Sequence, residues 1–222
     1  MHITSLVAGE EFANTYIDTT DSMTPITTNN FKTLKKIVVN LGGLNVNGFL
    51  REYYEANGYK YICVDIAKDS SVDITIKVGD KLPFDNQSID FIVSSSAFEH
   101  DPLFWMTFRE MCRIIKPEGF IFINALSCGS YYTYPINSYR FYLDASQSLA
   151  YWSGIELADT DTYPVKVIET FYIIDTELND FCCIWKRTDT KEQSYILSEH
   201  IINNKGPLEV AINNRGFSTY KK

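Results

Sequence analysis

A buried strand that ends in a glycine turn, followed by a helix and a second strand with an acidic tip, is the pattern that most limits how this chain can fold. The run KIVVNLGGLN ends at Gly42 and Gly43, and the apolar run YKYICVDIA reaches Asp65 about 20 residues after that turn. Glycines at such a turn let the backbone approach a ligand closely, and an acid at the tip of the second strand accepts hydrogen bonds from ribose hydroxyls. The pattern therefore predicts an α/β fold that binds a cofactor containing adenosine.

Two further motifs follow in a fixed order, which gives the pattern more weight than a glycine pair alone. The succession VVNLGG, VDI, LPFDNQSIDFIVSSSAFEH and RIIKPEGFIFIN covers about 90 residues, the scale expected of such a unit. It resembles the class I S-adenosylmethionine-dependent methyltransferases (type 11-like), in particular the broad group that acts on small molecules. A nicotinamide-binding domain would be expected to show the full G-x-G-x-x-G instead. The resemblance implies a Rossmann-like methyltransferase fold, with a mostly parallel seven-stranded sheet, helices on both faces and S-adenosylmethionine as cofactor.

Hydrophobic periodicity divides the chain into elements and one main domain. Apolar residues at helical spacing predict a core-facing helix over 104–115. Alternating or continuous apolar runs predict seven strands, over 36–41, 59–65, 72–77, 89–94, 119–124, 165–174 and 181–186. We expect a methyltransferase domain over 35–190. A polar, loosely structured lead-in and possible lid is expected over 1–34, and a C-terminal helical tail over 191–222.

Length and composition are those of one globular domain. The chain has 222 residues, of which 45% are hydrophobic and 22% charged, and no apolar stretch is long enough to span a membrane. The N-terminus lacks the pattern of a secretory signal, and the five cysteines show neither zinc spacing nor a disulfide framework. We therefore expect reduced thiols, a cytoplasmic location and no metal. A formal charge of -8 argues against a nucleic-acid partner.

The candidate cofactor residues follow from the resemblance and lie at the predicted strand ends. In the family the glycine turn usually runs acid-x-Gly-x-Gly, and here Asn40 takes the acid position and Leu44 stands in place of a spaced glycine. An ordinary turn at the glycines and a capping role for the acid after the second strand remain alternatives, and the acid of the GDKLPF loop could equally close a simple turn. The full cofactor set is Asn40, Gly42, Gly43, Leu44, Asp65, Ile66, Asp80, Leu82 and Ser95.

His100 is the candidate catalytic residue. It follows the serine run at the end of the fourth predicted strand, where the methionine part of the cofactor would meet the acceptor. A histidine at that position can act as a general base because its pKa lies near working pH. The equally weighted alternative is that His100 only caps the next helix or closes the cofactor pocket.

The segment CGSYYTYPINSYRFYLDASQSLAYW points to the acceptor. Its tyrosines offer flat faces with hydroxyl ends, and its arginine offers a forked donor for carboxylate or phosphate, which makes Tyr134, Tyr139 and Arg140 candidate substrate-binding residues. With VSSSAFEHDPLFW, the segment resembles a methyltransferase subgroup found among enzymes that build surface glycans, although the subgroup's histidine and one acid are absent. The alternative is a tyrosine-rich core segment in which Arg140 pairs with Asp144.

Methyl transfer from S-adenosylmethionine to a hydroxyl of a sugar or nucleotide-sugar is the function that we predict from these residues. The expected partner is a small-molecule acceptor, and the chain could also form a homodimer. A methyltransferase for a lipid or another small metabolite would share every cofactor residue. A catalytically degenerate domain that binds a partner is the alternative from another class, favoured by the altered glycine turn.

Overall fold

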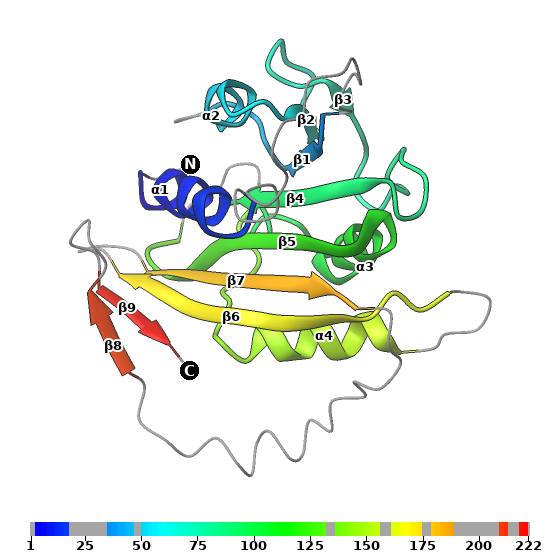
Figure 1. Cartoon of the computed structure of the whole chain (residues 1–222). Helices are drawn as coiled ribbons and strands as arrows, with labels where there is room; N and C mark the ends of the chain where they lie inside the picture. The colour runs from blue at the N-terminus through cyan, green and yellow to red at the C-terminus, as the bar shows by residue number, and fades with distance from the viewer. Residues whose placement is uncertain are drawn as a thin grey trace, which may run out of the picture.

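The computed structural model describes residues 3–17, 35–46, 50–131, 136–155, 161–174, 179–188, 209–212 and 218–221. A single twisted sheet runs through the molecule, with strands in the order β3-β2-β1-β4-β5-β7-β6-β9-β8 (Figure 1). Its strands are β1 (Ile37–Leu41), β2 (Lys60–Asp65), β3 (Ile74–Thr75), β4 (Ile89–Ser95), β5 (Ile115–Cys128), β6 (Val165–Ile174), β7 (Asn179–Arg187), β8 (Glu209–Ile212) and β9 (Ser218–Lys221).

The first seven strands have the predicted, mostly parallel arrangement. β3, β2, β1, β4 and β5 are parallel to their neighbours, whereas β7 is antiparallel to both β5 and β6. In the parallel part, β1 is buried along almost its whole length, which explains its continuous apolar sequence IVVNL. The carboxyl ends of β1, β2, β4 and β5 therefore meet at one edge of the sheet, and the candidate site residues lie there.

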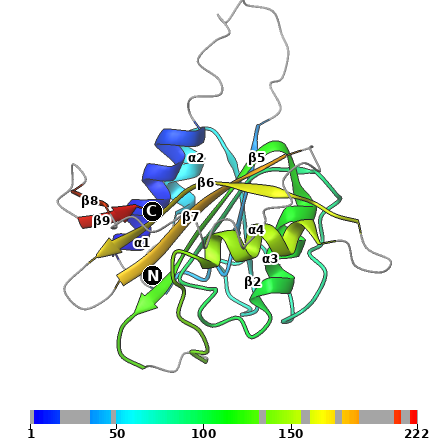
Figure 2. The same ribbon diagram turned by 90° about the horizontal axis from the view of Figure 1, so that it is seen from below.

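Helices cover both faces of the sheet, as predicted (Figure 1). One face carries α1 (Ile3–Phe12), which continues as the π-helical turn η1 (Ala13–Ile17), and α2 (Arg51–Ala56). The other face carries α3 (Phe104–Ile114) and α4 (Ala145–Gly154), which lie close together (Figure 2). The sheet thus separates two hydrophobic clusters, one that contains Phe12 and Tyr54 and one that contains Phe108 and Leu149.

Spacing along α3 explains why this helix forms where the sequence predicts it. Phe108, Met111 and Cys112 are fully buried and lie three and four positions apart, so they form one stripe on the helix. The ring of Phe108 meets the buried Trp185 of β7 edge-on, with centroids 4.9 Å apart. The helix is therefore fixed to the centre of the sheet through its apolar face.

The prediction of a loosely structured N-terminal lead-in is wrong for residues 3–17. These residues form α1 and η1, and Ala8, Phe12 and Ile17 are buried against the sheet. The ring of Phe12 stacks on that of Phe122 in β5, at 5.2 Å between centroids. The Thr- and Asn-rich composition of the later part of the segment misled the prediction, while the apolar spacing before it was given too little weight. Residues 18–34 lie outside the described part of the chain.

Two strands replace part of the helical tail predicted over 191–222. β8 and β9 pair with each other, and β9 pairs with β6, so they extend the sheet beyond the seven predicted strands. β-Branched and aromatic residues in EVAI and STYK favour strands, and the intervening segment contains a glycine, as hairpin connections often do. The remaining residues of the predicted tail lie outside the described part. The strand predicted over 72–77 is present but limited to Ile74–Thr75.

Replacing Phe108 by alanine tests the packing of α3 on the sheet. We expect Phe108→Ala to lower the free energy of unfolding by about 3–5 kcal/mol, because it leaves a cavity beside Trp185. Met106 lies on the same helix but is 45% exposed, so Met106→Ala should change stability by less than about 1 kcal/mol. Urea denaturation of the two variants measures both values, and equal losses would contradict this packing.

Candidate active site

The glycine turn after β1 is held in a conformation that favours glycine. Gly42 has a φ of 71°, and its amide donates to the carbonyl of Val64 in β2 at 2.9 Å. A Cβ at this position would lie 2.2 Å from the Cβ of Ala97, which follows β4. The turn thus passes close to both neighbouring strand ends, and it leaves backbone without side chain at the edge where a ligand would bind.

Asp65 ties this turn to the end of β2. One carboxylate oxygen accepts from the amide of Leu44 at 3.0 Å, and the other accepts from the amide of Ala67 at 2.8 Å. Each oxygen has a second lone pair, so the carboxylate can still accept hydrogen bonds from a ribose. The next side chain, Ile66, is 49% exposed, which is unusual for isoleucine and leaves an apolar surface for a base.

Asn40, in the position of the family acid, lies behind the turn. Its Nδ2 donates to the hydroxyl of Tyr61 at 2.5 Å, and a Cβ on Gly43 would come within 2.6 Å of the same nitrogen. Its Oδ1 is buried and has no hydrogen-bond partner among the described residues. The amide therefore fills the space behind the turn and keeps one acceptor for a donor that the unliganded chain does not supply.

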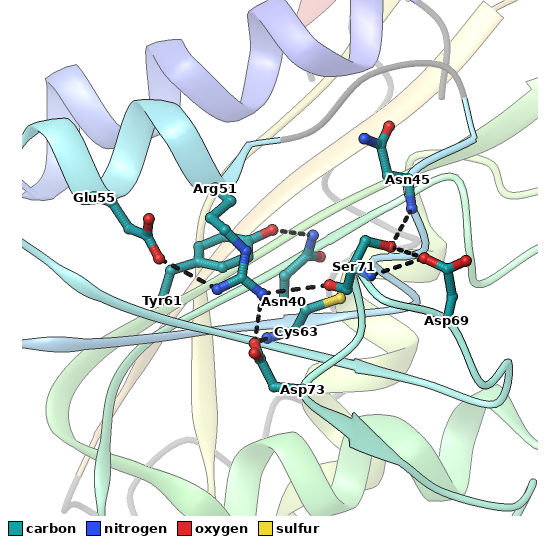
Figure 3. A network of polar contacts seen from close by, with 9 residues as sticks. All are labelled: Asn40, Asn45, Arg51, Glu55, Tyr61, Cys63, Asp69, Ser71 and Asp73. Atoms are coloured by element: carbon teal, nitrogen blue, oxygen red, sulfur yellow. Dashed lines mark hydrogen bonds and ion pairs between the residues drawn. The ribbon is translucent and has the colours of Figure 1, made fainter.

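A polar network fixes the backbone on the outer side of the turn (Figure 3). Arg51 of α2 donates to Asp73 Oδ2 at 2.6 Å, and the same oxygen accepts from the amide of Cys63 at 2.7 Å. The Arg51 guanidinium also lies over the ring of Tyr61, 5.0 Å from its centroid. Through these contacts α2, β2 and the loop after β2 form one unit behind the cofactor turn.

Three further cofactor candidates lie in different surroundings. Asp80 is exposed and accepts from the amide of Lys77 at 2.8 Å, which is the simple-turn geometry that the sequence left open. Leu82 is 3% exposed and belongs to the core cluster of Phe108. Ser95, at the end of β4, is 3% exposed, and its hydroxyl has no hydrogen-bond partner among the described residues. The cofactor roles of all three stay predictions.

His100 uses one ring nitrogen to hold the acceptor-side segment. Its Nδ1 donates a short hydrogen bond to the carbonyl of Ile136. Nε2 lies 3.9 Å from Oε1 of Glu99. The histidine therefore joins the loop after β4 to residue 136, and its basic nitrogen faces a carboxylate. Its catalytic role stays a prediction.

Glu99 is the most unusual ionisable group at this edge of the sheet. It is 0% exposed, and neither carboxylate oxygen has a side-chain hydrogen-bond partner among the described residues. Burial raises its pKa to about 7, and the charge of Asp180 adds to the rise. The backbone amides of Glu99 and Leu126 and the guanidinium of Arg140 oppose it. A carboxyl group of this kind can exchange a proton at neutral pH.

A buried polar cluster beneath α1 extends the site beyond the residues that we predicted. Ser5 of α1 donates to Asn124 Oδ1 at 2.7 Å, and its hydroxyl lies 3.4 Å from Asp180 Oδ2 and 3.2 Å from the hydroxyl of Ser96. Asn124 of β5 pairs with Ser95 of β4, and Asp180 is 2% exposed at the start of β7. No local sequence pattern joins these residues to Ser5 of α1.

Among the described residues of the tyrosine-rich segment, Tyr139 packs against the core and Arg140 holds the loop together. Tyr139 packs edge-on against Phe104, with centroids 4.9 Å apart, and its hydroxyl donates to the carbonyl of Pro102 at 3.3 Å. Arg140 donates to Asn137 Oδ1 and to the carbonyls of Tyr139 at 2.8 Å and Ser130 at 3.2 Å. Tyr134 lies outside the described residues. The substrate-binding roles of these three residues stay predictions.

The described residues contain neither a metal-binding cluster nor a membrane-spanning helix. No group of three or more His, Cys, Asp or Glu side chains there could hold a metal ion. No helix in the described ranges is both long and apolar enough to cross a membrane. All five cysteines are free thiols, four of them buried.

A family model described as "Methyltransferase domain" matches residues 43–123. The matched span begins in the glycine turn, ends in β5 and contains Asp65, Glu99 and His100. A search of curated protein sequences gives no significant match.

Solved structures share the fold over most of the chain. A S-adenosylmethionine-dependent methyltransferase from Archaeoglobus fulgidus is 16% identical, with a TM-score of 0.55 over 82% of this chain and 94% of that chain. The 1,6-didemethyltoxoflavin-N1-methyltransferase of Burkholderia thailandensis, solved with S-adenosylhomocysteine, is 9% identical, with a TM-score of 0.53 over 84% of this chain and 89% of that chain. The chain therefore has the fold of these S-adenosylmethionine-dependent methyltransferases, and a methyltransferase-domain model matches the part of it that contains the glycine turn and Asp65.

Two glycine substitutions distinguish the effect of the close contact at the turn from the effect of backbone strain alone. Gly42→Ala should weaken S-adenosylmethionine binding at least about tenfold and lower stability, because the new methyl group meets Ala97. Gly58 has a φ of 87° but open space around it, so Gly58→Ala should cost only about 1–2 kcal/mol of strain and leave binding unchanged. Calorimetry and urea denaturation measure both properties. Equal binding by the two variants would contradict our description of the turn.

The buried carboxyl of Glu99 predicts a specific dependence of stability on pH. Its pKa is about 7 in the native protein against a normal value of 4.5, so the folded chain holds a proton that the unfolded chain releases. This stabilising contribution is complete below about pH 4.5 and is lost as the pH rises through about 7. Relative to Glu99→Gln, the wild type should lose on the order of 3 kcal/mol of stability across that window.

Urea denaturation of both proteins at several pH values gives this difference directly. Asp180→Asn serves as a second comparison, because removing the Asp180 charge should shift the stability loss towards lower pH. A stability difference between wild type and Glu99→Gln that does not vary between pH 4.5 and 8 would show that Glu99 titrates normally.

Proposed function

We propose that the chain methylates a hydroxyl group of a sugar or nucleotide-sugar, with S-adenosylmethionine as the methyl donor. Binding of the cofactor is supported by the arrangement of the glycine turn and Asp65. The Asp65 carboxylate lies beside turn backbone that has no side chain, and the exposed Ile66 is next to it. Gly42, Gly43, Asp65 and Ile66 would hold the nucleoside part. Ser95, with its unpartnered hydroxyl, would face the methionine part.

The acceptor part of the proposal rests on the segment after β5. Tyr131 and Tyr142 are 77% and 68% exposed, so ring faces are available to a polyol on the side of the segment away from the core. The resemblance of this segment to methyltransferases of glycan assembly supports a sugar acceptor. Arg140 remains our candidate for a carboxylate or diphosphate, and it would exchange its loop carbonyls for that ligand.

Few chemical steps are required of the protein. The cofactor supplies an activated methyl group on a sulfonium. The residues at the sheet edge hold the acceptor oxygen in line with that methyl group and accept the hydroxyl proton. Exclusion of water by the surrounding buried side chains would limit loss of the methyl group to solvent.

The reduced state of all five cysteines agrees with a cytoplasmic setting, which we retain as part of the proposal. A small-molecule acceptor agrees with a formal charge of -8, which disfavours binding to nucleic acid. A homodimer stays a prediction.

Calorimetric titration with S-adenosylmethionine tests the cofactor site. We expect micromolar binding by the wild type and at least about tenfold weaker binding by Asp65→Ala, which loses charge-assisted hydrogen bonds to the ribose. Asp85→Ala is the matched control, because Asp85 is an exposed acid that does not belong to the polar network of Figure 3.

Transfer of a labelled methyl group to UDP-glucose and UDP-N-acetylglucosamine then tests the acceptor class. Turnover on either nucleotide-sugar supports the proposal. Cofactor binding without transfer to any sugar would contradict the sugar acceptor, and no cofactor binding by the wild type would contradict the enzyme function.

A further inference from the structure

Glu99 combines three properties that a structural carboxylate seldom has together. It is fully buried, its oxygens have no side-chain hydrogen-bond partner among the described residues, and it lies directly after the strand that leads to the candidate methyl-transfer site. A buried carboxylate without such partners is unfavourable by several kcal/mol in general. The arrangement is understandable if a donor arrives with a ligand.

The position of Glu99 fits an acceptor-binding role. Its carbonyl accepts from the amides of Ser138 and Tyr139 at 2.8 and 3.2 Å, so the tyrosine-rich segment that we assign to the acceptor lies directly against it. The groups that face its carboxylate come from three elements: His100 from the same loop, Arg140 from the acceptor segment and Asp180 from β7. Glu99 is thus surrounded by the acceptor segment and by the buried polar cluster beneath α1.

The geometry of His100 argues against that residue as the group that touches the acceptor. Its Nδ1 is engaged by the carbonyl of Ile136, and its only basic nitrogen faces Glu99 at 3.9 Å. A proton on Glu99 could pass to that nitrogen after a small movement. The histidine is therefore placed behind the carboxylate, as a positioning residue and proton outlet.

We propose that Glu99 is the catalytic base that takes the proton from the acceptor hydroxyl, and that His100 positions it and receives that proton. The inference rests on the proposed methyl transfer and refines the role that we first gave to His100. In the step, the acceptor O–H bond breaks and its proton moves to a Glu99 oxygen. The acceptor oxygen forms a bond to the methyl carbon while the carbon–sulfur bond breaks, and the sulfonium becomes a neutral thioether.

The buried neighbour Asp180 gives this base the strength that the step needs. Its charge and the low-dielectric surroundings favour the protonated form of Glu99, so the carboxylate binds a proton more tightly than an exposed glutamate does. A base whose pKa lies near the working pH is both available and effective.

A titration that needs no acceptor tests the placement of Glu99 beside the methyl donor. Glutamate labelled with 13C at the carboxyl carbon would be followed by NMR, and the Glu99 signal would be assigned by its loss in Glu99→Gln. The positive sulfonium of S-adenosylmethionine is absent from S-adenosylhomocysteine, so the Glu99 pKa should be lower by about one unit in the first complex. Glu118, whose side chain is 74% exposed and pairs with Lys186 near the start of β5, should titrate equally in both. Equal Glu99 pKa values in the two complexes would overturn the proposal.

Kinetics on an active nucleotide-sugar give the second test. Glu99→Gln should lower kcat at least about 100-fold, weaken S-adenosylmethionine binding relative to S-adenosylhomocysteine by no more than about tenfold, and remove the rise of rate with pH near 7. His100→Gln should retain that rise with a smaller loss of kcat. If Glu99→Gln does not fold, Glu99→Asp is used instead. A kcat that falls at least about tenfold while the pH dependence remains supports Glu99 as the base. An unchanged kcat would overturn that role.

These outcomes separate the two claims. Cofactor binding and turnover by the wild type, together with normal kinetics of Glu99→Gln, would remove Glu99 from the mechanism and leave the proposed function intact. A wild type that binds no S-adenosylmethionine would remove both.

Discussion

The two backbone hydrogen bonds accepted by Asp65 hold the parts of the site in one arrangement. They join the turn after β1 to the loop after β2, and so they fix both sides of the surface on which a nucleoside would lie. Because Gly42 also packs against Ala97 beyond β4, three adjacent strand ends depend on this single turn. The network around Arg51 and Asp73 supports it from outside (Figure 3). Loss of any of these contacts would change ligand geometry before it changed the fold.

The ionisable groups at the β4 end of the site, Glu99 and Asp180, are more deeply buried than Asp65. Near the glycine turn the carboxylate of Asp65 accepts from two backbone amides. Glu99 is fully buried, and the charge of Asp180 adds to the effect of burial in raising its pKa. We propose that one end of the sheet edge binds the hydroxyl-rich nucleoside and that the other exchanges a proton with the acceptor. That division matches a reaction in which a donor is held still and an acceptor must lose a proton.

Much of the fold could be predicted because its strands carry local signals. Continuous runs such as IVVNL and the 3.6-residue spacing of Phe108, Met111 and Cys112 each depend on neighbouring residues only. The glycine turn and Asp65 were found for the same reason, since their spacing is short. By contrast, α1 was missed because the Thr- and Asn-rich residues after it outweighed its apolar spacing, and its contact between Phe12 and Phe122 joins positions far apart in the chain. The strands β8 and β9 were missed because their pairing with each other and with β6 is not a local property.

The buried cluster could not be predicted from sequence for a related reason. Ser5, Asn124 and Asp180 are separated by more than 50 residues at each step, and each alone is an ordinary polar residue. Only the crossing of α1 over the ends of β5 and β7 brings their side chains within hydrogen-bond distance. Glu99 is next to His100 in sequence, but its complete burial depends on the fold.

A crystal structure of the chain with S-adenosylhomocysteine would test the central claim most directly. The account predicts ribose hydroxyls within hydrogen-bond distance of the Asp65 carboxylate, the adenine against Ile66, and the thioether sulfur at the end of β4 near Ser95 and Glu99. A nucleoside bound away from the glycine turn, or a sulfur directed away from Glu99, would contradict it.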